Sequence, residues 1–193
     1  LFNPSTSMRR RCAPTTVPLI EGTGRFVLQG RVSDGNAMAV GGVSGHAGVF
    51  SSAPDLARYA RALLTPATIF RPATVERFTM IVNASLSSRA LGWNTNNAQV
   101  PDRGWDLSCG VRWPASTFTH VGYAGTQICI DRERGVYSIL LTNRVYPSDA
   151  HSRMHTVRQS FGDAVHRVLE RDQLTRSDVG PGVSLQVQAD RRS

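Results

Sequence analysis

The chain has 193 residues, of which 40% are hydrophobic and 7% aromatic, a composition that suits one globular domain, or part of one, with a buried core. Its net charge of +8 is the difference between 22 basic and 14 acidic residues. All the basic residues are arginine and most of them are scattered, so we expect no nucleic-acid partner. No apolar run approaches the roughly 20 residues that cross a bilayer, and we predict no membrane span.

The first half of the chain is predicted to hold two helices after an irregular start. Residues 1–25 are rich in Pro, Thr and Arg and are expected to be irregular, and the glycine-rich residues 30–50 are expected to form a loop. Ser52, followed by an early proline and an aspartate, is typical of a helix N-terminus. Apolar residues at helical spacing follow until Pro66, and a second helix is predicted over 72–82.

The second half changes to a β pattern and ends in a long helix. Residues 89–94 are predicted to form a short strand and 95–114 a long loop. Three further strands are predicted over residues 116–121, 126–131 and 136–143. Apolar residues on one face, among them Val157, Val165 and Val168, predict a helix over 149–171, and the tail 172–193 is expected to be disordered. The fold class is therefore α+β, and a sheet covered on one face by one helix would leave much apolar surface without a partner.

Two patterns exclude other kinds of site. Three cysteines, Cys12, Cys109 and Cys129, are an odd number without C-x-x-C spacing, which argues against both a disulfide scaffold and a zinc site. The segment G-V-S-G-H at 42–46 is one residue short of the G-x-S-x-G nucleophile elbow, and it lacks the strand and the helix that must flank that elbow. We predict no metal site, and the compartment stays open.

Two longer segments carry a resemblance to a known family. Residues 41–57 read G-G-V-S-G-H-A-G-V-F-S-S-A-P-D-L-A, and residues 120–126 read H-V-G-Y-A-G-T. The second segment is followed by I-D-R-E at 130–133 and L-L-T-N-R-V-Y-P at 140–147. In this order the segments resemble the serine β-lactamase and penicillin-binding-protein family, most closely its class C-like esterase branch.

The resemblance implies a fold and a place in it. Residues 1–171 would form the C-terminal part of a β-lactamase/transpeptidase-like domain, an α+β fold with an antiparallel sheet, a C-terminal helix and part of the helical subdomain. The strand matching 136–143 would pair with strands that precede this region, so its edge would be open here. Open edges promote association, and we expect the isolated chain to self-associate.

The family's chemistry uses S-x-x-K with the nucleophilic serine, Y-x-N or S-x-N, and K-T-G or H-T-G on an inner strand. The third motif is present as H-V-G at 120–122. The resemblance implies that His120 relays a proton or places a charge, that Gly122 lets substrate approach, and that the N–H of Tyr123 forms half of an oxyanion hole. From the residues alone, the alternatives are that Gly122 marks a β-bulge and that His120 is an ordinary packed histidine.

Three further residues are candidates for contact with substrate. His46 lies in the segment that reaches the rim of the active site in the family; the alternative is that His46 bonds to backbone while the glycines allow a tight entry into the next helix. Asn143 and Arg144 follow the last strand, close to where class C relatives bind substrate carboxylates. The alternative for Arg144 is a solvated surface charge.

The missing motifs limit what this chain does alone. It contains no lysine, so S-x-x-K is impossible, and Y-x-N and S-x-N are absent too. Val121 and Ala124 stand where threonines are frequent, which favours a small-molecule ester or amide over a β-lactam as substrate; no cofactor is implied. The alternative is a non-catalytic protein that keeps the scaffold for binding. If the reading frame upstream of this chain encodes S-x-x-K, the chain is part of an enzyme. If the frame begins near Leu1, the chain is the non-catalytic protein.

Overall fold

The structure is a computed structural model that describes residues 1–18, 25–65, 69–98, 107–148 and 153–176. Its centre is an antiparallel sheet in the order β3-β4-β5-β6. The strands span Asn94–Thr95 (β3), Phe118–Val121 (β4), Gln127–Asp131 (β5) and Val136–Leu140 (β6). The three strands predicted after residue 115 are therefore confirmed, with shorter bounds. Within the described residues β6 pairs with β5 alone, so its other edge is open.

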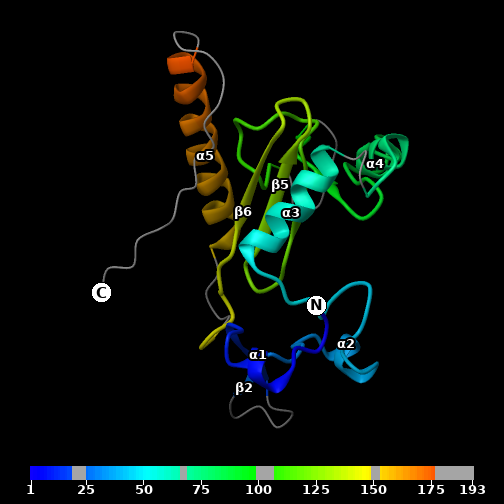
Figure 1. Ribbon diagram of the computed structural model, residues 1–193, viewed down its shortest axis with the longest axis vertical. Coiled ribbons are helices and arrows are strands. Elements are labelled where there is room, and N and C mark those ends of the chain that lie inside the picture. Colours follow the sequence, from blue (N-terminus) through cyan, green and yellow to red (C-terminus); the bar gives the residue numbers. More distant parts are fainter. Residues whose placement is uncertain (19–24, 66–68, 99–106, 149–152, 177–193) are drawn as a thin grey trace.

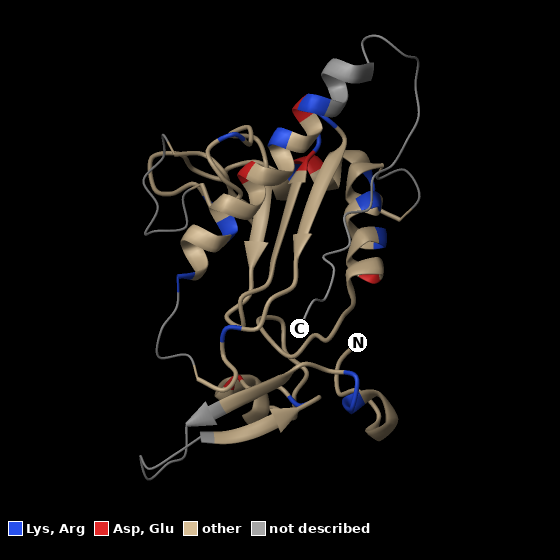
Figure 2. Ribbon diagram, turned by 90° about the vertical axis from the view of Figure 1, so that its left-hand side faces the viewer, with Lys and Arg blue, Asp and Glu red and all other residues tan. Residues whose placement is uncertain are grey.

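Helices lie against both faces of the sheet (Figures 1 and 2). Helix α3 (Ala53–Leu64) contacts β5 and β6 on one face, and α5 (Met154–Arg176) packs on the opposite one. The expectation of a single covering helix is wrong, because the helix at 53–64 also packs on the sheet. The prediction of an α+β fold is confirmed. No helix in the described ranges has the length and the apolar character that a membrane crossing needs.

The predicted helix starts and ends agree in part with the structure. The Ser52 side chain accepts a hydrogen bond from the Asp55 N–H at 3.4 Å, which confirms the predicted cap of α3. Helix α4 (Pro72–Thr79) begins where expected and ends three residues early. Helix α5 continues to Arg176, five residues past the predicted end, and the expectation for 177–193 falls outside the described residues.

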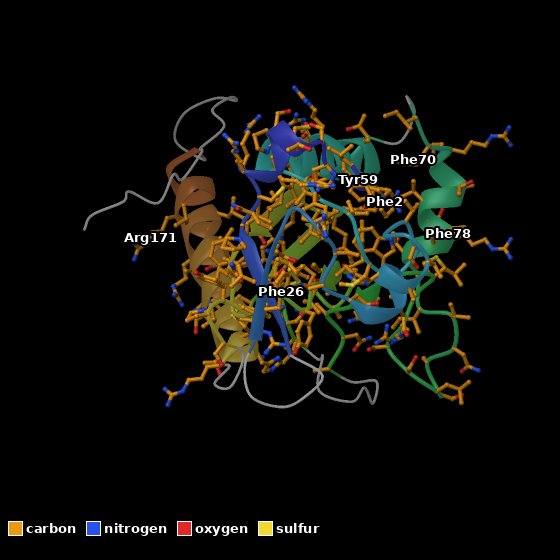
Figure 3. The ribbon with its side chains drawn as sticks, turned by 90° about the horizontal axis from the view of Figure 1, so that it is seen from below. Phe2, Phe26, Tyr59, Phe70, Phe78 and Arg171 are labelled. Carbon is orange, nitrogen blue, oxygen red and sulfur yellow. A yellow bond between two sulfur atoms is a disulfide. The ribbon has the colours of Figure 1, made fainter. Side chains whose placement is uncertain are left out.

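The face under α3 is apolar and aromatic. Ile128 and Ile130 of β5 point to this side and pack with Phe118, Ala60 and Leu63. A further aromatic group continues this core toward α4. Its members Tyr59, Phe70, Trp93 and Phe118 touch through ring centroids 4.9 to 6.4 Å apart, and Figure 3 shows Tyr59 and Phe70 side by side.

The face under α5 holds a disulfide between Cys109 and Cys129. Both cysteines are fully buried and pack with Trp113, Val136 and Val165. The expectation that the cysteine pattern argues against a disulfide is therefore wrong. An odd count does not prevent two of three cysteines from pairing, and the fold brings together residues separated by 20 positions. Cys12 is the free third cysteine.

The N-terminal region lies beyond one end of the sheet (Figure 1) and is more ordered than expected. Helix α1 (Thr6–Arg9) is followed by a hairpin of β1 (Pro14–Pro18) and β2 (Arg25–Gln29), and then by α2 (Gly35–Ala39). Prolines at both ends of β1 hid this strand from the sequence pattern. The hairpin is joined to the main sheet region by a hydrogen bond from Thr16 Oγ1 to the carbonyl of Val145 at 2.7 Å.

The predicted strand at 89–94 is instead a tight reversal. Arg89 and Asn94 form a bridge, the Ala90 N–H donates to the Trp93 carbonyl at 3.0 Å, and Gly92 has φ +80°. Glycine tolerates this backbone at little cost, so the chain turns there and enters β3 at Asn94. The middle of the predicted loop 95–114, residues 99–106, lies outside the described residues.

Candidate active site

His120 lies near the C-terminal end of β4. It is the third residue of this strand, paired with Ile128 of β5, and its side chain is exposed. The imidazole meets the ring of Trp93 edge-on, with centroids 6.4 Å apart. His120 is therefore not an enclosed core histidine, and its ring is accessible beside an aromatic side chain on the α3 face.

The strand ends in a closed turn over residues 122–126. The Gly122 N–H donates to the Thr126 carbonyl at 2.8 Å, and the Gly125 N–H donates to the Gly122 carbonyl at 3.0 Å. A Cβ on Gly122 would lie 2.2 Å from Thr126 Oγ1, and Gly125 has φ +110°. The turn itself thus requires both glycines, whether or not a substrate also approaches them.

Arg144 meets this turn from the segment after β6. Its backbone N–H donates to the Ala124 carbonyl at 2.8 Å and its Nε to the Tyr123 carbonyl at 2.5 Å. Its guanidinium carbon lies 4.2 Å from the centroid of the Tyr123 ring, a cation–π contact on an exposed tyrosine. Arg144 therefore belongs to the surroundings of the turn and remains partly exposed to solvent, and its role in substrate binding stays a prediction.

Arg158 of α5 supports the same turn from the buried side, and sequence reasoning missed it. Its Nη2 donates to the carbonyls of Gly122 at 2.8 Å and Thr126 at 3.2 Å, while the side chain is only 5% exposed. Burial lowers the pKa of Arg158, and the nearby charge of Arg144 lowers it further. Among the described residues, neither arginine has a carboxylate within ion-pair distance.

Asn143 is used inside the protein. Its Nδ2 donates to the carbonyl of Pro14 at 2.6 Å, and its Oδ1 accepts from the Val145 N–H at 3.3 Å. These bonds connect the N-terminal hairpin to the segment that follows β6. A role of Asn143 in substrate binding stays a prediction.

His46 forms side-chain contacts within its own region. Its Nδ1 lies 2.7 Å from Ser44 Oγ, and its Nε2 lies 3.0 Å from Asp34 Oδ1. Asp34 caps α2 by accepting from the Ala37 N–H at 2.8 Å; this bond, and then His46, lower the pKa of the Asp34 carboxyl. The partners of His46 are thus side chains and not the backbone considered from the sequence. A contact with substrate is untested.

The order Ser44, His46, Asp34 is that of a serine-hydrolase triad, but the surroundings differ from a nucleophile elbow. No strand directly precedes Ser44, since α2 ends at Ala39, and α3 begins only at Ala53. All three side chains belong to one connecting segment at least partly open to solvent. The prediction that this segment is no G-x-S-x-G elbow is confirmed by these elements.

The part of the chain that the structure describes contains no group of three or more His, Cys, Asp or Glu side chains that could hold a metal ion. The candidate site consists of the backbone turn at 122–126, the imidazole of His120 and the guanidinium groups of Arg144 and Arg158.

Comparison with known proteins decides the family. The family model described as Beta-lactamase matches residues 2–162. The chain belongs to the β-lactamase family. Its α+β arrangement is accordingly part of a β-lactamase-like fold, and both the segment around His46 and the H-V-G turn lie inside the matched range.

The chain is also similar to curated proteins that are named as hydrolases. An N-acetylmuramyl-L-alanine amidase of Bacillus subtilis (strain 168) is 33% identical over 123 residues, which cover 61% of this chain and 27% of that protein. Putative D-alanyl-D-alanine carboxypeptidases of Salmonella gallinarum and Salmonella newport are 31% identical over 136 and 135 residues, which cover 66% of this chain and 30% of each protein. The chain spans less than a third of the length of these relatives. No solved structure matches.

Proposed function

We propose that this β-lactamase-family chain supplies one side of the active site of a serine hydrolase, which cleaves a small-molecule ester or amide through an acyl-enzyme intermediate. The observation that most supports this is the closed turn at 122–126, which follows an exposed His120 and is supported by the buried Arg158. The serine that attacks would come from an S-x-x-K motif, which these 193 residues do not contain.

In this proposal the turn stabilises negative charge. The N–H of Tyr123 donates one of two hydrogen bonds to the oxyanion that forms when the serine attacks the carbonyl carbon. The turn is rigid before the reaction, because its own bonds and Arg158 fix the carbonyls of Gly122 and Thr126. Such fixed donors need no reorganisation as charge develops. His120 relays a proton between the serine and the leaving group.

Arg144 is proposed to bind a carboxylate of the substrate. Two guanidinium groups, of Arg144 and Arg158, lie near one turn, and the described residues supply no carboxylate to either. A bound carboxylate would offset this local excess of positive charge. The proposal also includes His46 and Asn143 as rim contacts, although a substrate would have to share them with Asp34 and the Pro14 carbonyl.

Esters and amides are proposed in preference to β-lactams. Val121 and Ala124 carry no hydroxyl groups, so two hydrogen bonds to a β-lactam carboxylate that threonines would provide are unavailable.

The test uses the longest polypeptide that the reading frame containing this chain encodes, with a p-nitrophenyl ester as substrate. His120→Gln should lower kcat/KM by about 10²-fold or more, because a positioned acid–base group contributes that much. His155→Gln, an exposed histidine on α5, is the matched control and should change kcat/KM less than about twofold. Equal effects of the two substitutions would contradict the role of His120.

Arg144 is tested with two esters that differ only by a carboxylate on the substrate. Arg144→Gln should raise KM about tenfold for the carboxylate-bearing ester, the cost of one lost charge-assisted pair. It should leave KM for the neutral ester nearly unchanged. Arg167→Gln, at an exposed position of α5, is the control and should leave KM for both esters nearly unchanged. An equal rise in KM for both esters would contradict carboxylate binding.

A second candidate function is a non-catalytic protein that keeps this scaffold to bind a ligand or partner. The observation that favours it is the complete absence of lysine from the chain, and with it of S-x-x-K. If the longest encoded polypeptide hydrolyses neither ester nor β-lactam, and no S-x-x-K precedes the chain, this second function replaces the first.

We also propose that the isolated chain self-associates through β6. The outer edge of this strand has no partner strand within the described residues, and its backbone N–H and C=O groups can pair with another copy. Light scattering after size-exclusion chromatography should show oligomers whose share rises with concentration. A single monomeric species across the concentration range would contradict this.

A further inference from the structure

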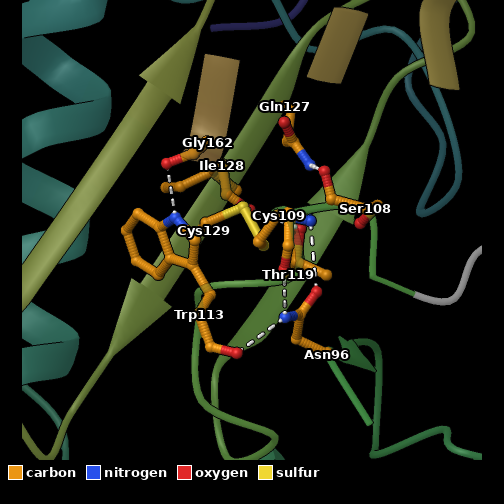
Figure 4. Close-up of a disulfide and its surroundings, with 10 residues drawn as sticks. Asn96, Ser108, Cys109, Trp113, Thr119, Gln127, Ile128, Cys129 and Gly162 are labelled. Carbon is orange, nitrogen blue, oxygen red and sulfur yellow. Dashed lines mark hydrogen bonds between the residues drawn. A yellow bond between two sulfur atoms is a disulfide. The ribbon is translucent and has the colours of Figure 1, made fainter. Parts of the chain in front are cut away.

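The disulfide connects the middle of the sheet to the segment before β4 (Figure 4). Cys129 lies at the centre of β5, opposite Thr119 of β4 and Ser138 of β6. Cys109 lies in the segment that passes under α5, with a Cα–Cα distance of 6.0 Å to Cys129, and neither cysteine is exposed. The bond therefore lies on the α5 face of the sheet, on the strand next to the one that carries His120.

Buried hydrogen bonds hold the Cys109 segment in place. The Asn96 side chain, 1% exposed, donates to the carbonyls of Gly110 at 2.9 Å and Trp113 at 3.1 Å, and accepts from the Cys109 N–H at 3.2 Å. Gln127 of β5 is also buried and donates to the Ser108 carbonyl at 2.6 Å. The segment is thus tied to the sheet on both sides of Cys109.

Helix α5 packs directly against the Cys109 segment. Gly162 lies so close to the segment that a Cβ built there would be 1.8 Å from the Cys109 carbonyl oxygen. The Trp113 indole N–H donates to the Gly162 carbonyl at 2.8 Å. Two thiols need more space than two bonded sulfur atoms, because unbonded atoms meet at van der Waals distance. The segment and β5 cannot move apart without breaking these contacts, so we expect reduction of the disulfide to disturb this packing.

We infer that the chain matures in an oxidising compartment, where a thiol–disulfide oxidoreductase joins Cys109 to Cys129. One cysteine thiolate attacks the oxidant's disulfide and forms a mixed disulfide; the other thiolate attacks that bond and releases the oxidant as a dithiol. The chain loses two protons and two electrons, which the oxidant gains. Disulfides of this kind form and persist in exported proteins, whereas the cytosol keeps thiols reduced. Cys12 stays a thiol.

The experiment counts thiols in the full chain made in two compartments of one bacterium, with and without a cleavable export signal. One sample of acid-quenched cells is treated with N-ethylmaleimide without reduction, and a second sample is treated after reduction. The modified cysteine peptides of the unreduced sample are counted by mass spectrometry, and the reduced sample gives the total number of cysteines. We expect one modified cysteine, Cys12, in the exported chain and three in the retained chain. Three free thiols in the exported chain, or a disulfide in the chain quenched inside the cytosol, would overturn the inference.

A second measurement shows whether the bond matters for the fold. The double variant Cys109→Ser, Cys129→Ser is compared with Cys12→Ser, each exported and digested with a dilute protease. The double variant should be cleaved at least about tenfold faster, because loss of a native disulfide raises the population of opened chains. Cys12→Ser should match the unmodified chain. Equal cleavage rates for the two variants would overturn the inference that this packing requires oxidation.

Discussion

The two faces of the sheet are built from different chemistry. Toward α3 the strands present Phe118, Ile128 and Ile130, which pack against apolar and aromatic side chains. Toward α5 the residues of β5 are Gln127, Cys129 and Asp131, all buried. The first face is stabilised by apolar area removed from water, and the second by specific bonds. On the α3 face, the loss of stability on substitution should therefore grow with the side-chain volume removed. On the α5 face, it should depend on which hydrogen bond or disulfide is lost.

The α5 helix follows the same division. Its buried stripe is Arg158, Gly162 and His166, spaced four residues apart. Val157 and Val168, which the apolar pattern placed on the buried side, are each 43% exposed. Val165, from the same predicted apolar face, packs against the disulfide cluster, so the hydrophobic pattern located the buried side of this helix only in part.

Phe118→Ala should have the largest effect, a loss of about 4 kcal/mol in the free energy of unfolding. Phe118 is 1% exposed at the centre of the α3 face, and the substitution leaves a cavity there. Urea unfolding of the oxidised chain measures the change. Phe78→Ala is the control, since Phe78 is 47% exposed and should cost about 1 kcal/mol or less. Equal losses at both positions would contradict a core on this face.

Gly162→Ala should come next, at about 2 kcal/mol, because an added methyl group collides with the Cys109 carbonyl. The sign is the informative part: in a free helix the same change would stabilise by about 1 kcal/mol. The exposed position Ala164 of the same helix serves as a reference, where Ala→Gly should cost about 1 kcal/mol. A stabilising Gly162→Ala would mean that α5 does not pack on the disulfide segment.

Trp113→Phe should cost about 1 to 2 kcal/mol, because it removes the indole N–H that donates to the buried Gly162 carbonyl. Trp93→Phe on the other face is the comparison and should cost less, since Trp93 is half-buried and contributes ring contacts. If Trp93→Phe proved the more costly, the α5 face would not depend on specific hydrogen bonds as described.

Asp34→Asn should have the smallest effect and should depend on pH. Asparagine keeps the cap of α2, so the variant removes mainly the charge. The Ala37 N–H and then His46 lower the pKa of the Asp34 carboxyl below 3.8 in the folded chain. Its stabilising contribution is therefore complete above pH 3.8 and is lost as the pH falls through the lowered value. Thermal melting should show a less stable variant at pH 7 and a difference that shrinks as the pH falls below 3.8, with Glu76→Gln as control.

Sequence reasoning recovered elements whose signal is local. The cap at Ser52 and the apolar spacing after it predicted α3, and the β-rich runs after residue 115 predicted β4, β5 and β6. The strand β1 was missed because Pro14 and Pro18 interrupt its pattern. The disulfide was missed because cysteine pairing depends on which segments the fold brings together.

The candidate site divides in the same way. Gly122, Tyr123 and Arg144 lie together at the turn that follows His120, and the roles that the motifs imply for them stay predictions. Arg158 escaped prediction because nothing in the residues near it marks a helical arginine as the partner of a turn 32 residues earlier. The Ser44, His46 and Asp34 contacts were also unseen, since the hydrogen bonds within a connecting segment depend on its folded path.

The central claim is that this chain carries the oxyanion side of a serine hydrolase without its nucleophile, and labelling with a fluorophosphonate tests it most directly. The oxidised chain is incubated with the probe beside an active serine hydrolase in the same tube, and the adduct is measured by intact mass. We predict no adduct on the chain while the reference enzyme is labelled fully. A stoichiometric adduct would contradict the claim, and an adduct on Ser44, which lies 2.7 Å from His46, would identify the nucleophile within this chain.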